Sequence, residues 1–417
     1  MDNNIISVRL WNMEVGLLYW DSTKHRSIFT FNEDFLERHL DIAPFAAPIE
    51  GLLKRQNFAI EGSRDKSYSG LPTFIADSLP DKWGNQLFKQ WAKEQGIRSR
   101  DLTPIDRLSF IGKRGMGALE FHPAHVQDEA SFEVNIDSLY RLAEQIFKER
   151  EQVNFTVEEV KSLQNLYRVG TSAGGRRPKA LIAINEKTGV VRSGQVELPE
   201  DFSYFLLKFD ESDAFPFTAV EYAYYLMAID AGITMMPSQL IEVEGASHFL
   251  TKRFDRKEGR KIHTQTVAAM SSMADSYEDI FSIARRLRLS SGEITELYRR
   301  TVFNILAANV DDHNKNFSFM MDVDGIWHLT PAYDMTFTVD LSAPSYVNRH
   351  EFTLGGKVDS FTLGDLKHLA EIEGIKDYKN IIEQVSTAIG NFRTYADKAQ
   401  ITKEWVNRID NYLSELI

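Results

Sequence analysis

Cysteine is absent from the 417-residue chain, which excludes disulfides, thiolate zinc sites and cysteine nucleophiles together. Long apolar runs are also missing: the longest span only a few residues, whereas a membrane-spanning helix needs about 20. The opening, MDNNIISVRLWN, is acidic and then strand-like, unlike the basic and then apolar start of a secretory signal. These absences favour a cytoplasmic protein that has no membrane contact.

Positive charge is in deficit, with 48 Lys and Arg residues against 60 Asp and Glu residues and a formal net charge of −12. Such a surface can release few phosphate counterions, which argues against nucleic acid as the main partner, although a local basic patch could still contact it. The composition, 43% hydrophobic and 12% aromatic, excludes general disorder. At about 100–200 residues per domain, the length predicts two or three globular units.

Short alternating segments predict a small β-rich subdomain over residues 1–125. Its strands are expected at Ile5–Leu10, Glu14–Trp20 and Ser27–Phe31. The segment His122–Asp137 is polar and aperiodic, so it is the best candidate for a linker. We therefore expect a domain boundary near residues 125–150.

The rest of the chain, residues 150–417, changes from strands to helices. Strands are predicted at Ala180–Asn185 and Tyr204–Asp210, and Thr218–Glu221 predicts a capping box that opens a helix. Helices dominate from about residue 276, including Ile294–Val310. The expected fold class is α+β with two lobes, a β-rich lobe at about 150–260 and a helical lobe at about 261–417.

The densest group of polar side chains is Asn309–Asn316, NVDDHNKN, which precedes a hairpin predicted around Asp324-Gly325. Because a tight hairpin brings its two ends together, Asn316 and Asp334 should lie on neighbouring strand ends. Their oxygens could then share a hard cation such as Mg²⁺. Asp311 would face whatever that cation holds, as a carboxylate suited to taking a hydroxyl proton. The alternative is a polar loop whose side chains cap the backbone.

Two further signals precede this loop. Lys208 lies among apolar neighbours in a predicted strand, where a buried ammonium needs a partner, and Glu221 on the following helix is best placed to supply one. Alternatively, Lys208 points outward. Gly170–Lys179 is a glycine-bearing basic loop that could approach phosphate oxygens, although it lacks the Walker A ending and could equally be a flexible surface loop.

A glycine loop, a strand lysine, a helix glutamate, an acid–amide loop and a further aspartate follow in the order used by two-lobed phosphoryl-transfer enzymes. At this point the sequence resembles the HipA-type serine/threonine kinases, the toxins of bacterial toxin–antitoxin pairs. The resemblance covers nearly the whole chain, and its most specific motif is DxHxKN followed by YD. The matching segments are Gly70–Asp81, Asp106–Phe121, Gly170–Lys179, Leu207-Lys208, Lys252–Arg256, Asp311–Asn316 and Ala332–Asp334.

The resemblance implies a role for each matching position. Asp311 would be the catalytic base, Asn316 and Asp334 would bind Mg²⁺, and Lys208 would hold the ATP phosphates with Glu221 as its partner. Lys252, Arg253 and Phe254 would form a hinge whose backbone meets adenine, and Asp255 would approach the ribose. Thr171, or Ser172 beside it, falls where family members autophosphorylate. The remaining residues expected to contact the nucleotide are Ala173, Gly174, Gly175, Lys179, His313 and Lys315.

The resemblance also implies partners: a small DNA-binding antitoxin of the HipB type, DNA only through that antitoxin, and a protein substrate with a Ser or Thr hydroxyl. In this family an aminoacyl-tRNA synthetase is one type of target. Two alternatives remain. In one, Asp311, Asp312, His313 and Asp334 bind two metals for hydrolysis. In the other, the chain is a catalytically silent module that binds a partner.

Overall fold

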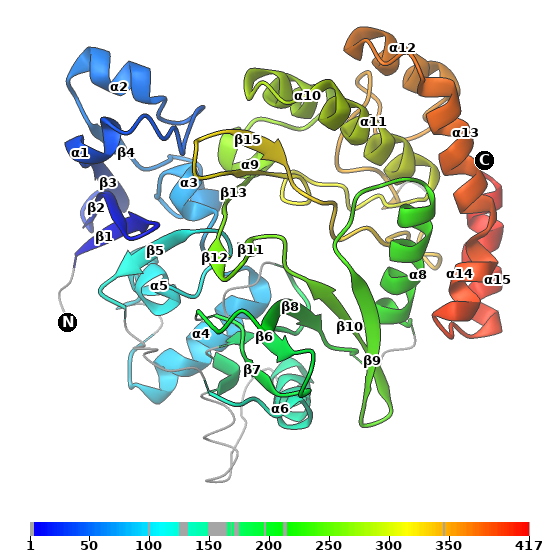
Figure 1. Ribbon diagram of the computed structural model, residues 1–417, viewed down its shortest axis with the longest axis horizontal. Helices are drawn as coiled ribbons and strands as arrows, with labels where there is room; N and C mark the ends of the chain where they lie inside the picture. Colours follow the sequence, from blue (N-terminus) through cyan, green and yellow to red (C-terminus); the bar gives the residue numbers. More distant parts are fainter. Residues whose placement is uncertain are drawn as a thin grey trace.

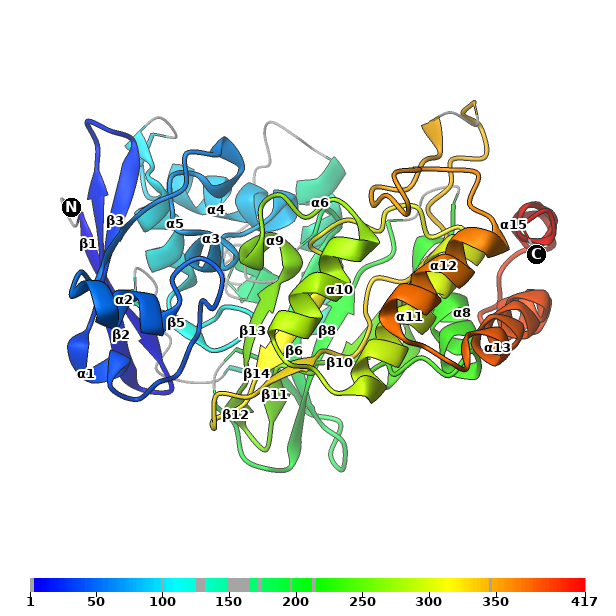
Figure 2. The same ribbon diagram turned by 90° about the horizontal axis from the view of Figure 1, so that it is seen from above.

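The computed structural model places three parts along the molecule's long axis, with an N-terminal sheet at one end and the C-terminal helices at the other (Figures 1 and 2). A second sheet lies between them. The residues described are 4–98, 101–124, 132–148, 165–167, 169–170, 175–195, 197–211, 215–344 and 347–416. No helix among these residues is both long enough and apolar enough to traverse a bilayer.

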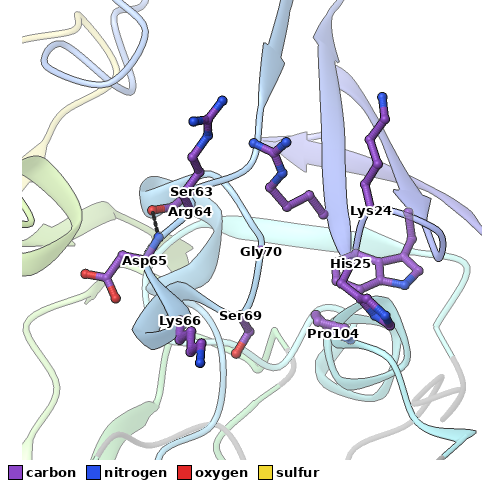
Figure 3. Close-up of a pocket in the computed structure, with 11 residues that line it drawn as sticks. Lys24, His25, Ser63, Arg64, Asp65, Lys66, Ser69, Gly70 and Pro104 are labelled. Atoms are coloured by element: carbon purple, nitrogen blue, oxygen red, sulfur yellow. Dashed lines mark hydrogen bonds between the residues drawn. The ribbon is translucent and has the colours of Figure 1, made fainter.

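The N-terminal sheet is antiparallel and has the strand order β4-β3-β2-β1-β5. Its three predicted strands are confirmed with shifts of one residue at most. The turn between β2 and β3 lies beside the loop that precedes α3 (Figure 3). The strands are β1 Ile5–Leu10, β2 Met13–Asp21, β3 Arg26–Phe31, β4 Ala59–Glu61 and β5 Leu119–His122.

The second sheet, with the order β7-β6-β8-β10-β9, forms the β-rich lobe. Its central strand β8 pairs with β6 on one side and β10 on the other, so residues at the end of β8 are enclosed. The strands are β6 Lys179–Asn185, β7 Val191–Ser193, β8 Phe202–Lys208, β9 Ser238–Val243 and β10 Ala246–Lys252.

A third, small sheet, β13-β14-β15, begins the helical lobe, and the two-residue strands β11 and β12 precede it. The predicted hairpin is confirmed, because β14 pairs with β15 across a turn in which Gly325 has φ 80°. The strands are β11 Arg256–Lys257, β12 Arg260–Lys261, β13 His263–Thr266, β14 Ser318–Met321 and β15 Trp327–Leu329.

Helices surround these sheets and make up most of the C-terminal part (Figure 1). Those up to the second sheet are α1 Glu33–Leu36, α2 Ile49–Arg55, the 3-10 turn η1 Lys66–Tyr68, α3 Thr73–Ala76, α4 Lys82–Glu94, α5 Pro104–Ile111 and α6 Ile136–Lys148. The later helices are α8 Phe217–Asp230, α9 Val267–Met270, α10 Tyr277–Arg286, α11 Ser291–Leu306, α12 Leu363–Glu373, α13 Tyr378–Gly390, α14 Phe392–Lys398 and α15 Lys403–Ser414. The predicted α+β fold class, with a β-rich N-terminal region and a helical C-terminal region, is therefore confirmed.

The capping box predicted at the start of α8 is wrong. Pro216 occupies the N-cap, and the hydroxyl of Thr218 donates instead to the carbonyl of Ser247 at 2.6 Å. Glu221 is drawn away from the helix start by the buried ammonium of Lys208. A charge-assisted bond in a buried place outweighs the capping of a backbone N–H group.

The N-terminal subdomain shares its buried side chains with both later lobes. Its sheet belongs to one continuous apolar core with helices α8 to α15. Helix α4, through Trp83, Leu87 and Phe88, packs instead into the core of the second sheet, beside Leu207. The subdomain is thus wedged against both lobes.

Part of the segment His122–Asp137, which was expected to be a linker, belongs to the β-rich lobe instead. Residues 125–131 lie outside the described residues, but the amide of Val134 donates to the carbonyl of Val191 at 3.0 Å, so this segment joins the edge of β7. Helix α6 then begins at Ile136, within the range expected to be linker, and contributes Leu139 to the core of the second sheet.

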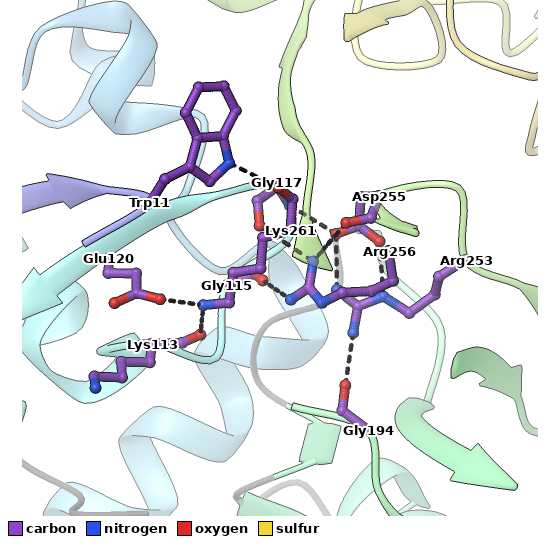
Figure 4. Close-up of polar contacts among 10 residues, drawn as sticks. All are labelled: Trp11, Lys113, Gly115, Gly117, Glu120, Gly194, Arg253, Asp255, Arg256 and Lys261. Atoms are coloured by element: carbon purple, nitrogen blue, oxygen red, sulfur yellow. Dashed lines mark hydrogen bonds and ion pairs between the residues drawn. The ribbon is translucent and has the colours of Figure 1, made fainter. Parts of the chain in front are cut away.

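A buried ionic network ties the N-terminal subdomain to the end of the second sheet (Figure 4). The carboxylate of Asp255, which is fully buried, accepts from Arg253 at 2.7 Å, from Arg256 at 2.7 Å and from the amide of Gly117 at 2.8 Å. Burial alone would raise the pKa of Asp255, but the two guanidinium groups outweigh it and hold the pKa far below its usual range. This network fixes the glycine turn before β5 onto the chain that leaves β10.

Replacing the Asp255 carboxylate should reduce the stability of the fold. Asp255→Ala should lower the free energy of unfolding by about 3–5 kcal/mol, because it leaves two buried guanidinium groups uncompensated. Urea denaturation measures the change. The matched control is Asp359→Ala, which breaks a half-exposed pair with Arg349 at 3.2 Å and should cost less than about 1 kcal/mol. Equal losses in the two variants would contradict a structural role for the network.

Candidate active site

The polar loop between α11 and β14 is anchored by Asp312. Its carboxylate is fully buried, lies 2.8 Å from Nδ1 of His350, and accepts from the hydroxyl of Tyr277 and from the amide of Glu351 at 2.9 Å. Asp312 therefore cannot serve as an open metal ligand, which removes one member of the two-metal hydrolysis alternative. Among the described residues there is no cluster of three or more acidic and histidine side chains that could hold a metal.

Asp311, the neighbour of Asp312, has the opposite environment. Its side chain is 60% exposed, and Oδ1 lies 4.0 Å from Nε2 of His313. Burial of its surroundings and the negative charges of Asp334 and Glu351 raise its pKa, although His313 opposes the shift. The anchored Asp312 thus presents Asp311 outward as a mostly exposed carboxylate with a raised pKa.

The hairpin brings its two ends together, as the sequence predicted. The hydroxyl of Tyr333 donates to the carbonyl of Lys315 at 2.8 Å and also contacts the hydroxyl of Ser318. This places Asp334, which has a left-handed backbone with φ 56°, beside the loop that carries Asn316. The amide nitrogen of Asn316 donates to the carbonyl of Asp311 at 2.7 Å, which leaves its oxygen as an acceptor.

Lys208, at the end of β8, is buried and bridges two carboxylates. Its ammonium donates to Glu221 on α8 at 2.6 Å and also to Asp334. Burial would lower the pKa of Lys208, but these two carboxylates outweigh it and raise the pKa. Burial likewise raises the pKa of Glu221, whereas the pKa of Asp334 falls well below its usual range because Lys208 and Lys179 outweigh burial. The expected pair of Lys208 with Glu221 is present.

Lys179, the first residue of β6, is a second buried cation beside Lys208. It is 3% exposed, and burial together with the charge of Lys208 lowers its pKa to about 8. Gly175 lies directly over it: a Cβ atom there would come within 2.2 Å of the Lys179 nitrogen, and its φ of 107° also favours glycine. The end of the glycine loop is therefore folded onto Lys179.

Asp81 is a residue of this site that the sequence did not reveal. It stands at the start of α4 and accepts from the amide of Gly175 at 2.7 Å and from the ammonium of Lys315 at 2.6 Å. Burial would raise its pKa, but Lys315 and the amide outweigh it and lower the pKa. The Asp81 carboxylate, which belongs to the N-terminal subdomain, thus joins the glycine loop to the polar loop. The only signal was its position at the end of Gly70–Asp81, which gives no indication of a partner more than 200 residues away.

The site offers oxygen donors that suit a hard cation. Asn316 keeps its amide oxygen, and Asp334 has a carboxylate whose charge is balanced by the ammonium of Lys208. Amide and carboxylate oxygens are the ligands Mg²⁺ prefers, and Mg²⁺ commonly uses only one or two of them, with phosphate and water completing its shell. The residues therefore fit Mg²⁺ better than zinc.

Of the other residues predicted to contact the nucleotide, some lie outside the described residues and some lie where the chain leaves the second sheet. Thr171, Ser172, Ala173 and Gly174 lie outside the described residues. Lys252 ends β10, and the chain through Arg253 and Phe254 leaves the sheet there, with the Phe254 ring stacked on Tyr333 at 5.7 Å. This is where a hinge would run.

Asp255 requires a correction, because its carboxylate is fully buried among Arg253, Arg256 and Gly117 and cannot reach a ribose. The side chain of Arg253 is engaged in the same network. The basic residues that made this segment look like a ligand-facing motif instead neutralise a buried acid.

A buried strand lysine paired with a helix glutamate, next to an acid–amide loop and an aspartate after a hairpin, defines the class of two-lobed, kinase-like α+β proteins. Residues 171–392 match the HipA-like C-terminal domain, and residues 6–122 match the HipA N-terminal domain. The chain belongs to the HipA-type kinase family.

Similarity to known proteins extends over most of the chain. It is 23% identical over 411 residues to "Putative kinase Y4dM" of Sinorhizobium fredii, covering 93% of this chain and 90% of that protein. "Putative kinase Y4mE" of the same organism is 25% identical over 142 residues, which are 30% of this chain and 34% of that protein. HipA of Shewanella oneidensis MR-1, solved with HipB and operator DNA, has the same fold at 15% identity, with a TM-score of 0.66 over 99% of this chain and 95% of that one.

The buried charge of Lys179 should reduce stability. The folded chain releases this proton near pH 8, whereas the unfolded chain holds it up to the ordinary pKa of 10.5, so folded stability rises with pH between these values. Lys179→Met should therefore raise the free energy of unfolding at pH 7 by roughly 1–3 kcal/mol, and the gain should disappear by about pH 10.5. Denaturant unfolding at several pH values measures it. Lys187→Met, at an exposed turn, is the control, and a gain independent of pH would contradict the assignment.

Proposed function

We propose that this chain is an ATP- and Mg²⁺-dependent protein serine/threonine kinase. The observation that carries the proposal is the double bridge of Lys208 to Glu221 and Asp334, with the exposed carboxylate of Asp311 on the adjoining loop. A lysine–glutamate pair on the β-rich lobe next to an aspartate after a hairpin is the arrangement that positions phosphates in two-lobed kinases. Family membership supports the same activity.

In this proposal the chain's own groups position and activate two substrates. Asp311 accepts the proton of a Ser or Thr hydroxyl as its oxygen attacks the γ-phosphorus; the bond to the bridging oxygen breaks, and ADP leaves. Burial and the neighbouring charges of Asp334 and Glu351 raise the pKa of Asp311, which makes it a better base than an ordinary aspartate. Lys208, Lys179 and Lys315 supply positive charge toward the phosphates. Mg²⁺ held by Asn316 and Asp334 would offset charge on the phosphate oxygens.

We also propose that the kinase is the toxin of a toxin–antitoxin pair. The structural neighbour was solved with HipB and operator DNA, and the net charge of −12 here would complement a basic DNA-binding antitoxin. DNA contact would then be indirect. Autophosphorylation at Thr171 or Ser172 would belong to the same proposal, because these hydroxyls lie in the glycine loop that ends at Gly175 and Lys179.

Removing the base or the metal carboxylate tests the activity. Asp311→Ala and Asp334→Ala should each lower phosphate transfer by roughly 10³-fold or more, because each removes an interaction with charge that develops in the transition state. A radiolabelled transfer assay measures the rates. Asp324→Ala, an exposed carboxylate in the turn of the same hairpin, should leave the rate unchanged.

The same variants separate the proposal from the alternatives. Calorimetry should show ATP binding that depends on Mg²⁺ in the Asp311→Ala protein and a loss of that dependence in Asp334→Ala. If the chain is a toxin, expression of the unmodified protein without an antitoxin should arrest growth, and expression of the Asp311→Ala protein should not. Near-native transfer by either variant would remove the kinase assignment, and absence of ATP binding by the unmodified protein would favour a silent binding module.

Asp81 should act as a positioning residue for this reaction. Asp81→Asn keeps an acceptor for the amide of Gly175 but loses the charge that holds Lys315, whereas Asp81→Ala loses both. Charge-assisted bonds of this kind contribute about 1.5–3 kcal/mol, so kcat/KM should fall about tenfold in the first variant and further in the second.

Steady-state kinetics with ATP as the varied substrate gives the graded result, and the loss should appear mainly in KM because both held groups face the phosphates. Glu37→Gln, an exposed acid in the same subdomain, is the matched control. Unfolding curves recorded in parallel separate a kinetic effect from instability. Wild-type kinetics in both Asp81 variants would show that the N-terminal subdomain does not position the site.

A further inference from the structure

A pocket of about 540 Å³ opens on the N-terminal subdomain and shares no residue with the candidate active site (Figure 3). Lys24 and His25 of the β2–β3 turn lie on one side, and the loop that carries Arg64 and Lys66 lies on the other. Arg26 also lines it. This concentration of basic side chains occurs on a chain whose net charge is −12.

The walls of the pocket are held by backbone contacts. Ser27 donates its amide to the carbonyl of Gly70 at 2.8 Å, and its own carbonyl accepts from the amide of Gly62 at 2.8 Å. A Cβ atom on Gly62 would lie 1.9 Å from the Gly70 carbonyl oxygen, so only glycine permits this approach. The two loops are therefore fixed relative to each other, and the hollow between them is preformed.

The basic side chains are incompletely neutralised. Arg26 pairs with Glu61 at 3.0 Å, and the ammonium of Lys24 lies 3.8 Å from Asp21. For the side chains of Arg64, Lys66 and His25, the described part of the chain provides no hydrogen-bond or ion-pair partner.

The one carboxylate that lines the pocket is already engaged. Asp65 accepts from the amide of Ser67 at 2.9 Å and from its hydroxyl at 2.8 Å, as the N-cap of η1. It therefore balances neither Arg64 nor Lys66 through a direct bond. Cations that are gathered around a hollow and only partly neutralised repel one another, and an anion placed between them would relieve that repulsion.

We infer that this pocket binds phosphate groups. Guanidinium and ammonium groups on both sides of a fixed hollow can bind phosphate oxygens from opposite directions, and arginine suits them through paired N–H donors. A volume of this size accommodates a small phosphorylated molecule. The same chemistry is present in the phosphodiester backbone of a nucleic acid, so the ligand is defined here by its phosphates. The inference does not depend on the proposed kinase activity.

The test uses the full chain and two phosphate probes, inorganic tripolyphosphate and a short single-stranded oligodeoxynucleotide, in calorimetric titrations at low and high salt. The pocket variant combines Arg64→Ala with Lys66→Ala. The matched control combines Lys54→Ala with Arg55→Ala, which removes the same charge from exposed positions on α2 of the same subdomain.

The unmodified chain should bind at least one probe, more weakly at high salt, and the pocket variant should lose about tenfold or more in affinity while the control keeps it. Arg64→Lys, which retains the charge, should bind within a few-fold of the unmodified chain and guards against a folding defect. Binding of tripolyphosphate identifies a small phosphorylated ligand, and binding of the oligonucleotide alone identifies a nucleic-acid backbone. Absence of binding to both probes, or equal losses in the pocket and control variants, would overturn the inference.

Discussion

The ammonium group of Lys208 stands between two carboxylates that come from different lobes. Glu221 belongs to α8, which packs on the second sheet, and Asp334 follows the hairpin of the helical lobe. Because the group is buried, losing either partner would leave a poorly compensated charge. The Nζ atom of Lys208 thereby fixes the position of the hairpin relative to the second sheet. The polar loop next to that hairpin carries Asp311 and Asn316. The geometry of the site depends on this contact more than on any other.

The N-terminal subdomain makes a second constraint on the same site. Helix α4 is packed into the core of the second sheet, while the N-terminal sheet shares a core with the helical lobe, so the subdomain contacts both sides of the junction. Three carboxylates accept hydrogen bonds across the boundary between the subdomain and the rest of the chain. They are Asp77, from the amide and hydroxyl of Thr266; Asp81, from the amide of Gly175 and the ammonium of Lys315; and Asp255, from the amide of Gly117. A change in the subdomain would reach the site through these hydrogen-bonded and ion-paired groups.

Much of the site could be predicted because its signals are local. Asp324-Gly325 specified the hairpin, and the hairpin brings the segment that carries Asp334 back to the loop that carries Asn316. Contacts between distant segments left no such signal, which is why Asp81 was missed. Predictions from local sequence also failed where a buried charge was involved. Glu221 was expected to cap the start of α8 but pairs with Lys208 instead, and Asp255 was expected to approach a ligand but is buried between Arg253 and Arg256. In both cases desolvation decided the outcome, and desolvation is a property of the folded neighbourhood.

The cations of the site are already paired within the chain, and this bears on how a ligand would bind. Lys208 is held by Glu221 and Asp334, and Lys315 is held by Asp81. If a triphosphate binds here with a divalent cation, as proposed above, its phosphate oxygens would compete with these carboxylates for the lysines, and Asp334 would have to exchange its contact with Lys208 to hold the metal. Such an exchange conserves the number of charge contacts, so most of the binding free energy must come from the smaller differences in geometry and desolvation between the two sets. The same internal pairs keep the lysines in place before any ligand arrives.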